Sequence, residues 1–507
     1  MSYKILHIGN IANNAYLNSK YLRTAGISSD VLCYDYYHVM GSPEWEEAII
    51  EGDYGNEYDP NWSKTNLNGF KRPNWFMEGP LEFVASKYFA IHVKDASKNN
   101  GETQEMILLR KMRSGVYVGE SFIFRVYLRF FGNKYGKKLT PLLTFSGKIL
   151  GFIFNGIINY LFWAEKQLLP KNTPTTKDGV NINYLNSLIS SFEEYFPKRK
   201  DKLTIKDILP YLPKTLIFKE ILKKYDLVQG YALDPIYTML AEKRPYIAFE
   251  HGTIRDIPFE DSARGRLTAL AYRMADLVFI TNADNLKAAK KLGLKNYQPI
   301  PHPINEIWHR KIQAQKNHQK NNKIILFCPI RHDWEIKGTD LYIRALPKLV
   351  RNIKKPFKMV FVNWGMETEK SKSLIKKMKV EKYVEWLEPL PRYELSKWME
   401  KCDIVLDQLA LPHMGATAPE AMLAGKPVLM SYKPESTDWM HPRAPIVSVF
   451  TPDDISQAIQ KLVSDPQKAK QIGREGQIWY HKNYSEKIVL DQLLKNYNKL
   501  LRKHYER

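Results

Sequence analysis

The chain has 507 residues, which is enough for two or three domains that each bury a core. Hydrophobic residues make up 44% and charged residues 26%, an ordinary balance that excludes a disordered, collagen-like or disulfide-scaffold protein. The formal net charge of +22 favours anionic partners such as nucleic acid, anionic lipid or phosphorylated substrates. The sequence contains no helix-turn-helix, zinc-finger or RNP-like aromatic motif, so we expect no nucleic-acid partner.

The three cysteines and the first residues bear on the compartment. Cys33, Cys328 and Cys402 lie far apart in or beside apolar segments, and they form no metal-binding or redox motif. We expect buried thiols in a reducing compartment. The opening MSYKILHIGN starts a strand directly, without the basic region, long apolar run and cleavage site of a secretion signal. We therefore expect a cytoplasmic location.

The first half of the chain begins as a parallel βαβ layout, with strands at residues 4–9 and 30–36 and a helix at 17–26. Residues 41–74 lack a clear period and predict an irregular loop. From about 81 to 213 the alternation gives way to long amphipathic stretches, which predict a mostly helical insertion. Strands are again expected at residues 225–231, 244–252 and 276–282. This pattern predicts a Rossmann-like domain over residues 1–305, followed by a polar linker around 318–322.

The second half alternates more regularly and predicts a doubly wound parallel sheet over residues 306–480, with ligands at the carboxyl ends of its strands. The expected strands are 323–330, 358–365, 382–388, 403–408 and 427–431, and the expected helices include 339–353, 392–401 and 418–424. A last helix, within residues 481–507, starts at Ser485 and has one apolar face. That face must dock, and its position in the sequence leaves either domain available.

Residues 329–338, PIRHDWEIKG, place two cations between a strand and a helix. Arg331 and Lys337 beside a helix N-terminus are suited to a diphosphate, because charge-assisted hydrogen bonds and the helix dipole both favour an anion. The alternative is two solvated charges on a loop of a basic protein.

Residues 412–428, PHMGATAPEAMLAGKPV, contain Gly415 for close backbone approach and Gly425 to end a helix. Glu420 is either a carboxylate for a sugar or ribose hydroxyl, or the far end of a capping box begun by Thr417.

Residues 384–393, VEWLEPLPRY, offer backbone groups to a nucleobase with Leu390 or Tyr393 beneath it, or are an ordinary connecting loop.

The order of Arg331, Lys337-Gly338, VEWLEPL and EAMLAGKPVLMS resembles the donor-binding domain of the family 4 retaining glycosyltransferases. The resemblance covers about residues 227–501 and implies the α/β GT-B fold, in which two Rossmann-like domains face a cleft. It implies that Arg331 and Lys337, followed by Gly338, hold the donor diphosphate and that Glu420 binds the nucleotide ribose. It also implies that the last helix returns to the first domain.

One position departs from the family pattern. The family signature has two glutamates separated by seven residues, and the first falls at Pro412, which cannot make its contact with the donor sugar hydroxyls. His413, or backbone groups of Met414, Gly415 and Ala416, are the candidates to substitute. The family's sugar preference therefore does not carry over.

In the first domain, Gly9 and Asn10 stand where the family has a glycine-containing loop near the phosphates and the acceptor. His251 matches a family histidine at the mouth of the cleft, with a structural histidine as the alternative. The implied mechanism uses positive groups to stabilise the departing nucleoside diphosphate while the acceptor attacks, with retention of configuration. No D-x-D or His/Asp metal constellation is present in the sequence, so we predict no essential metal and no cofactor besides the nucleotide-sugar co-substrate.

The predicted insertion is basic and aromatic between residues 110 and 170. Its uncharged segment ILGFIFNGIINYLFWA, residues 149–164, has 16 residues, fewer than the roughly 20 that span a bilayer. We expect this region to bind the anionic inner face of the cell membrane, with a buried helix or a dimer contact as alternatives.

Two functions follow from the sequence. The first is a glycosyltransferase that moves a sugar from a nucleotide-sugar donor to a glycan or lipid-linked acceptor, in surface polysaccharide or glycolipid synthesis. The second is a non-catalytic GT-B scaffold that binds a nucleotide sugar or glycan at the membrane, which Pro412 keeps open. Another GT-B chemistry, such as sugar-nucleotide epimerisation, is disfavoured by the order of the motifs.

Overall fold

The computed structural model describes residues 3–34, 36–85, 88, 181–315, 323–433 and 442–506. The chain divides into two compact units, Met1–Gly79 with Ser191–Arg507, and Pro80–Ser190. In the smaller unit, residues 81–85 are helical and helix α7 (Ile182–Tyr195) begins. The basic, aromatic region 110–170 and the linker 318–322 lie outside the described residues, so their predicted roles stay predictions.

The larger unit contains a first sheet of seven parallel strands in the order β5-β2-β1-β6-β7-β8-β9. Strand β1 pairs with β2 on one side and with β6 on the other, so the strand order reverses at β1. The strands are β1 Lys4–Ile8, β2 Ser28–Cys33, β5 Phe76–Glu78, β6 Leu227–Tyr231, β7 Tyr246–Glu250, β8 Leu277–Ile280 and β9 Tyr297–Pro299. Strands β6, β7 and β8 are buried at every residue, as expected for a parallel sheet covered on both faces.

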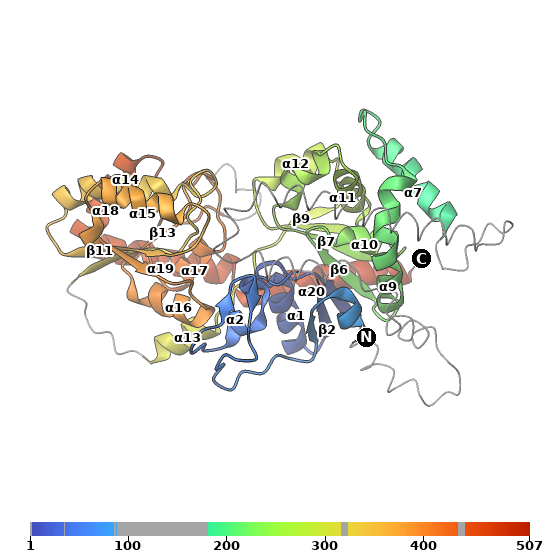
Figure 1. Ribbon diagram of the computed structural model, residues 1–507, viewed down its shortest axis with the longest axis horizontal. Coiled ribbons are helices and arrows are strands. Elements are labelled where there is room, and N and C mark those ends of the chain that lie inside the picture. Colours follow the sequence, from blue (N-terminus) through green and yellow to red (C-terminus); the bar gives the residue numbers. More distant parts are fainter. Residues whose placement is uncertain are drawn as a thin grey trace, which may run out of the picture. The chain divides into compact units, whose positions relative to one another are not determined.

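Helices cover both faces of this first sheet (Figure 1). Helix α1 (Asn14–Thr24) and helix α20 (Glu486–Tyr505) share one apolar core with residues of β1, β2, β6, β7 and β8. The opposite face carries α10 (Pro235–Leu240), α11 (Ala263–Met274) and α12 (Asn285–Lys291). The remaining α-helices here are α2 (Pro43–Glu47), α8 (Ile205–Ile208) and α9 (Leu212–Leu222). Helix α13 (Ile307–Ala314) follows the last strand of this sheet and packs against α16 (Arg392–Lys401). We call this sheet with its helices the first domain.

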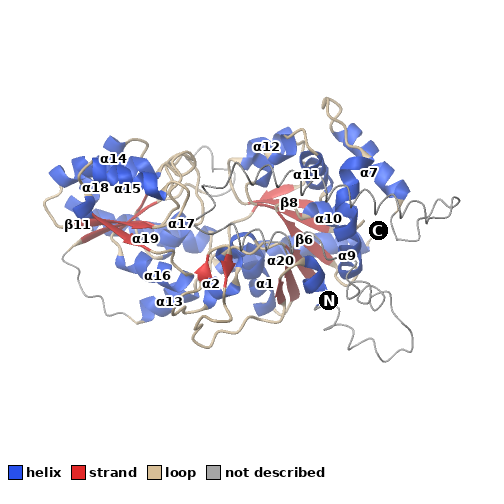
Figure 2. Ribbon diagram, in the orientation of Figure 1, coloured by secondary structure: helices blue, strands red, loops and turns tan. Residues whose placement is uncertain are grey.

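The second sheet has six parallel strands in the order β12-β11-β10-β13-β14-β15, and β10 is the point of reversal. The strands are β10 Ile324–Cys328, β11 Phe357–Val362, β12 Val384–Leu387, β13 Ile404–Leu406, β14 Val428–Met430 and β15 Val447–Ser448. One core lies beneath α14 (Thr339–Asn352), α15 (Thr368–Lys377) and α18 (Pro452–Ser464). A second lies beneath α16 (Arg392–Lys401), α17 (Thr417–Leu423) and α19 (Pro466–Asn483) (Figure 2). This is the second domain.

Helix α20 resolves the choice that the sequence left open. Its residues Val489, Leu493, Tyr497 and Leu501 are buried in the core of the first domain. The Tyr497 hydroxyl also donates a 2.7 Å hydrogen bond to Gln229 Oε1 on β6. The chain thus passes through the second domain and returns to the first.

Several short elements differ from the sequence prediction. The stretch 41–74, expected to be irregular, contains helix α2 and the two-stranded hairpin of β3 (Gly55–Asn56) and β4 (Asp59–Pro60). Pro43 at the first turn of α2 and the acidic Glu44 and Glu46 explain why so short a helix forms. The three cysteines are buried and unpaired, as expected. Among the described helices, none is both long and apolar enough to cross a membrane.

Candidate functional site

The polar residues singled out in the sequence lie at the carboxyl ends of the strands in both sheets. In the first sheet these are the loops after β1 and β7, and in the second sheet those after β10, β12 and β13. In open parallel sheets this edge, near the point of strand reversal, is where ligands bind. Strand order therefore brings segments distant in sequence to one side of each sheet.

The loop between β10 and α14 carries both predicted diphosphate cations. Arg331 is exposed and makes no hydrogen bond or ion pair to the described residues. In the first domain, burial raises the pKa of Tyr36 and Glu57 and the Arg331 charge opposes that rise, whereas burial and Arg331 together lower the pKa of His38. Arg331 therefore faces the first domain across the interface. Lys337 is half-buried, and its Nζ donates a 2.6 Å hydrogen bond to Gln408 Oε1.

Burial lowers the pKa of Lys337, and the nearby Asp407 carboxylate opposes that shift. Asp407 directly follows β13, is buried, and leaves its Oδ2 without a hydrogen-bond partner among the described residues. The positive fields of Arg331 and of Arg255, a residue of the first domain, also lower the pKa of Lys337. Three cations from two domains thus lie close enough to repel one another, which an anionic ligand would relieve.

Gly338 fixes the end of this loop. Its φ is +65°, and it precedes the first residue of α14. A Cβ at this position would lie 3.0 Å from Leu409 Cβ and 3.1 Å from the Ala410 backbone nitrogen. Only glycine adopts this backbone without strain and also leaves room for the loop after β13.

Glu420 belongs to a buried ion triad that joins the two domains. Arg392, at the start of α16, pairs with Glu420 Oε1 and also lies 3.3 Å from Glu46 Oε1 on α2. Burial raises the pKa of Glu46, and Arg392 counteracts this. The capping-box alternative for Glu420 is wrong, because α17 begins after Ala416 without a side-chain cap and the carboxylate turns to Arg392.

The segment that begins at Pro412, predicted to lie beside a donor sugar, is bordered by a contact between the domains. His413 is buried, and its Nε2 lies 3.3 Å from Oδ1 of Asp284, the residue before α12. Arg255 Nε donates a 2.6 Å hydrogen bond to Asp284 Oδ2. Burial lowers the pKa of His413, Asp284 opposes this, and Arg255 and Lys337 reinforce it. The imidazole is therefore neutral near pH 7.

The remaining residues predicted to bind the donor have differing surroundings. Ala416 is exposed, and Met414 is buried in the second-domain core. A Cβ added to Gly415 would meet only Gln408 Oε1, at 3.9 Å, so no described protein atom demands glycine there. Leu390 is half-buried at the end of the β12 loop.

Tyr393, the alternative to Leu390 beneath a nucleobase, already has its ring packed against other side chains. The Tyr393 ring packs on Trp308 of α13, with ring centroids 4.9 Å apart. Lys397 lies on the same ring, 5.2 Å from its centroid. Leu390 is thus the better placed of the two side chains proposed to lie beneath a base.

In the first domain, Gly9 has a φ of +84°, and a Cβ there would lie 2.1 Å from Asp234 Oδ2. The side chain of Asn10 is buried and bonds within its own loop, donating to Gly41 O and accepting from Tyr16 N. Both residues therefore shape the loop after β1. A contact of Asn10 with a donor would have to come from its backbone.

His251 follows β7 in a cluster of polar side chains. Its ring lies 5.0 Å from that of His302, edge to face, and its Nδ1 is 3.5 Å from Asn14 Nδ2. Burial, with help from Arg255, lowers its pKa to about 4. His251 is therefore neutral at pH 7 and can accept or donate one hydrogen bond.

The sequence did not single out four of the residues that shape this site: Arg255, Asp284, Arg392 and Glu46. Each acts through a partner in the other domain or on a distant loop, so no local motif marks it. A weak signal existed for Arg255 and Asp284, because both follow strands of the first sheet within a few residues.

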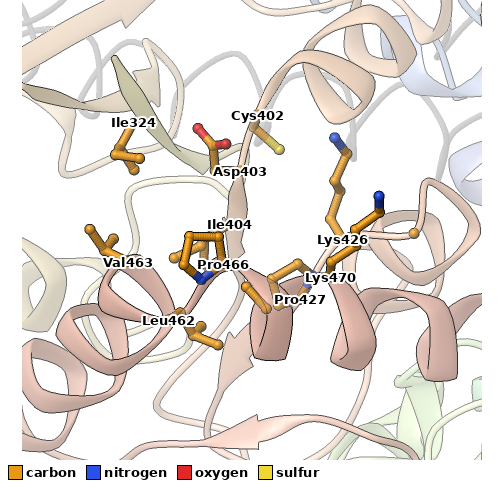
Figure 3. A pocket seen from close by; sticks show the side chains of 12 residues that line it. Ile324, Cys402, Asp403, Ile404, Lys426, Pro427, Leu462, Val463, Pro466 and Lys470 are labelled. Carbon is orange, nitrogen blue, oxygen red and sulfur yellow. The ribbon is translucent and has the colours of Figure 1, made fainter. Parts of the chain in front are cut away.

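The described residues also form a pocket at the opposite edge of the second sheet (Figure 3). It has a volume of about 230 Å³ and is lined at the strand starts by Ile324, Asp403 and Pro427. Asp403 Oδ2 accepts a hydrogen bond from Ile325 N, and Lys426 Nζ donates one to Glu400 O. These polar groups serve the fold, and the pocket is at the wrong end of the strands for the chemistry above.

A family model described as Glycosyl transferases group 1 matches residues 309–479, from α13 to α19. No curated protein matches the chain. Among solved structures, a glycosyltransferase from Rickettsia africae is 13% identical, with 99% of both chains covered and a TM-score of 0.48. HepE from Anabaena, in complex with UDP and glucose, is 18% identical over 57% of this chain and 82% of its own, with a TM-score of 0.45. A sucrose-phosphate synthase from Thermosynechococcus elongatus is 17% identical over 59% of this chain and 81% of its own, with a TM-score of 0.46.

Proposed function

We propose that this chain, a glycosyltransferase of the GT-B fold whose group 1 domain spans residues 309–479, transfers a sugar with retention of configuration. The donor is a nucleotide sugar, and the acceptor is a glycan or lipid-linked glycan. Residues 1–305 form the acceptor domain in this proposal, and residues 306–480 the donor domain. The observation that carries it is the convergence of Arg331, Lys337 and Arg255 at the reversal point of the second sheet.

The nucleotide end of the donor is assigned to three side chains. Arg331 is free of protein partners among the described residues, and Lys337 is held by Gln408, so both cations are available to two adjacent phosphates. Arg392 fixes Oε1 of Glu420, while Oε2 accepts no hydrogen bond from the described residues. A ribose hydroxyl is a suitable donor to Oε2, because hydrogen bonds to ionised groups are the strong ones.

Catalysis in this proposal is electrostatic and positional. As the bond between the anomeric carbon and the diphosphate breaks, negative charge grows on the leaving phosphate beside Lys337 and Arg331. The acceptor hydroxyl attacks from the face that the diphosphate leaves and gives its proton to the departing phosphate oxygen. Since these cations neutralise the leaving group, we propose that no metal is required. Turnover that is unchanged by EDTA is the expected result, and loss of turnover restored by Mg²⁺ would refute it.

We also propose that the protein works in surface polysaccharide or glycolipid synthesis, on the cytoplasmic side of the cell membrane. The net charge of +22 supports attraction to anionic lipid. Flotation with vesicles of phosphatidylglycerol and phosphatidylcholine at low salt is expected, with release at high salt. Protein that stays at the bottom of the gradient at low salt would refute the membrane proposal.

The decisive test is a donor screen with UDP-, GDP- and ADP-sugars that measures both binding and sugar release. We expect one nucleotide class to bind, and Arg331→Ala or Lys337→Ala to weaken its binding roughly 10- to 100-fold, since each loses a charge-assisted hydrogen bond. Arg344→Ala and Lys397→Ala are matched controls, because both side chains are exposed and pair on one helix with Asp340 and Glu394.

Three results would contradict the proposal in different ways. Equal effects of the site variants and their controls would show that the diphosphate site is misplaced. Binding without turnover of any donor, with cell extract as acceptor, would favour the non-catalytic scaffold. Inversion of the anomeric configuration, read by NMR of the product, would refute retention alone.

A further inference from the structure

The contact between His413 and Asp284 lies close to the proposed diphosphate site and joins the two domains. Lys337 Nζ donates to Gln408 Oε1, and Gln408 Nε2 donates to the carbonyl oxygen of His413 at 2.6 Å. The Gln408 side chain therefore connects Lys337, a predicted diphosphate ligand, to the backbone of His413. A sugar attached to the diphosphate would lie next to His413.

Only one oxygen of the Asp284 carboxylate accepts a hydrogen bond from the described residues. Arg255 Nε holds Oδ2 at 2.6 Å. The other oxygen, Oδ1, is buried and lies 3.3 Å from His413 Nε2, yet it accepts no hydrogen bond from the described residues. A buried carboxylate oxygen without a donor is costly, so its position favours a ligand that supplies one.

The charges decide what kind of ligand fits. Asp284 is negative and would repel a phosphate, whereas the cations Lys337 and Arg331 lie on the nucleotide side. The buried, neutral imidazole of His413 presents one ring nitrogen as donor or acceptor, and the carboxylate accepts two or more hydrogen bonds. A neutral group rich in hydroxyls, joined directly to a diphosphate, satisfies both requirements.

We propose that Asp284 and His413 together bind the hydroxyls of the donor sugar, so that the first domain supplies the carboxylate that selects the sugar. This inference rests on the proposed function. Arg255 acts as a positioning residue, because it fixes the carboxylate through Oδ2 and leaves Oδ1 for the sugar. Asp284, the specificity residue in this proposal, belongs to the first domain, whereas the nucleotide site belongs to the second. The sugar is therefore recognised only when the two domains are in contact.

The test compares nucleoside diphosphates with their sugar conjugates in the full-length protein. UDP, GDP and ADP are titrated by calorimetry, followed by UDP-glucose, UDP-galactose, GDP-mannose, GDP-glucose and ADP-glucose. For Asp284→Asn we expect affinity for the diphosphate to stay within about twofold of wild type. Affinity for the preferred nucleotide sugar is expected to fall roughly 10-fold or more, the effect of losing a charged hydrogen-bond acceptor.

Discrimination between epimers is the sharper readout. UDP-glucose and UDP-galactose differ at one hydroxyl, and so do GDP-mannose and GDP-glucose. Asp284→Asn is expected to narrow the kcat/KM ratio of such a pair, which a merely structural role would leave unchanged. Asp261→Asn is the matched control, because this aspartate is in the same domain and its side chain is 82% exposed.

A second variant, His413→Asn, tests the same site from the other domain. It replaces Asp284→Asn in these measurements if Asp284→Asn fails to fold. If both variants weaken diphosphate and nucleotide-sugar binding equally, the pair is only a latch between domains and the inference is overturned. Unchanged nucleotide-sugar affinity and epimer ratio would overturn it as well. If the wild type binds no nucleoside diphosphate, the proposed function fails first, and with it this inference.

Discussion

Replacing Arg392 by methionine tests whether the buried ion triad holds the two domains together. The side chain of Arg392 is 17% exposed, and those of its partners Glu46 and Glu420 are 1% and 5% exposed. The substitution keeps most of the side-chain volume but leaves two buried carboxylates without a cation. Breaking a buried ion pair in this way costs about 3–5 kcal/mol. For a domain of this size that loss lowers Tm by roughly 10 °C.

The assay is thermal and urea unfolding followed by circular dichroism, with midpoints compared because two domains need not unfold in one step. Arg344→Met is the control, since Arg344 is 44% exposed and pairs with Asp340 on one helix, where a loss below about 0.5 kcal/mol is expected. The double variant Arg392→Met/Glu420→Gln removes one of the stranded charges and should recover part of the loss. An Arg392→Met midpoint equal to that of the control would refute the reasoning.

The pH dependence of the stability loss in Arg392→Met is an independent test of the ion triad. Burial raises the pKa of Glu46, so its contribution to stability is full below its ordinary pKa of 4.5 and is lost as pH rises through the higher folded value. Arg392 opposes that rise in pKa, and without it the carboxyl binds its proton more tightly. The stability difference between wild type and Arg392→Met should therefore be small near pH 5 and larger at pH 8. The reverse order would contradict the account.

Three further predictions concern single residues. Gly338→Ala should lower stability by about 2 kcal/mol, because a left-handed residue costs about 1 kcal/mol and the new Cβ crowds Leu409; urea midpoints measure the loss, and nucleotide affinity should fall with it. Burial raises the pKa of Glu250 to about 8, so between pH 4.5 and about 8 the unfolded chain releases this proton while the folded chain keeps it. Wild type should therefore lose stability relative to Glu250→Gln as pH rises over that range, which unfolding curves measure. Tyr497→Phe removes the hydrogen bond to buried Gln229 and should cost about 1–2 kcal/mol by thermal unfolding, with nucleotide affinity unchanged.

Each of these has an outcome that would count against its premise. A Gly338→Ala protein with unchanged stability would mean that the loop before α14 relaxes freely. A pH-independent difference for Glu250→Gln would mean that Glu250 is ionised throughout. Loss of nucleotide binding in Tyr497→Phe would mean that the docking of α20 shapes the donor site, which lies in the other sheet.

Hydrophobic periodicity in the sequence is sufficient to predict the long helices and strands, but it does not predict the short ones. The strands at the two sheet centres are mostly apolar, and α16 occupies the predicted residues Arg392–Lys401. Strands β5, β9 and β15 have three, three and two residues, too few for any period to show. Helix α2 was missed for the same reason, although it carries Glu46.

The same division runs through the candidate site. Arg331, Lys337 and Gly338 could be predicted because they are consecutive features of one loop between a strand and a helix. The pairing of His413 with Asp284, and of Arg392 with Glu46, joins loops of different sheets. Such pairings depend on how two domains meet, and a single sequence contains no local pattern for that.

The route of the chain through α20 imposes an order on folding during synthesis. The core of the first domain includes Val489, Leu493 and Tyr497, which leave the ribosome after the entire second domain has been made. The second domain is continuous from Ile324 to Asn483 and can complete its core first. Until α20 arrives, the apolar face that it covers on the first sheet stays exposed, while the second domain can already be folded.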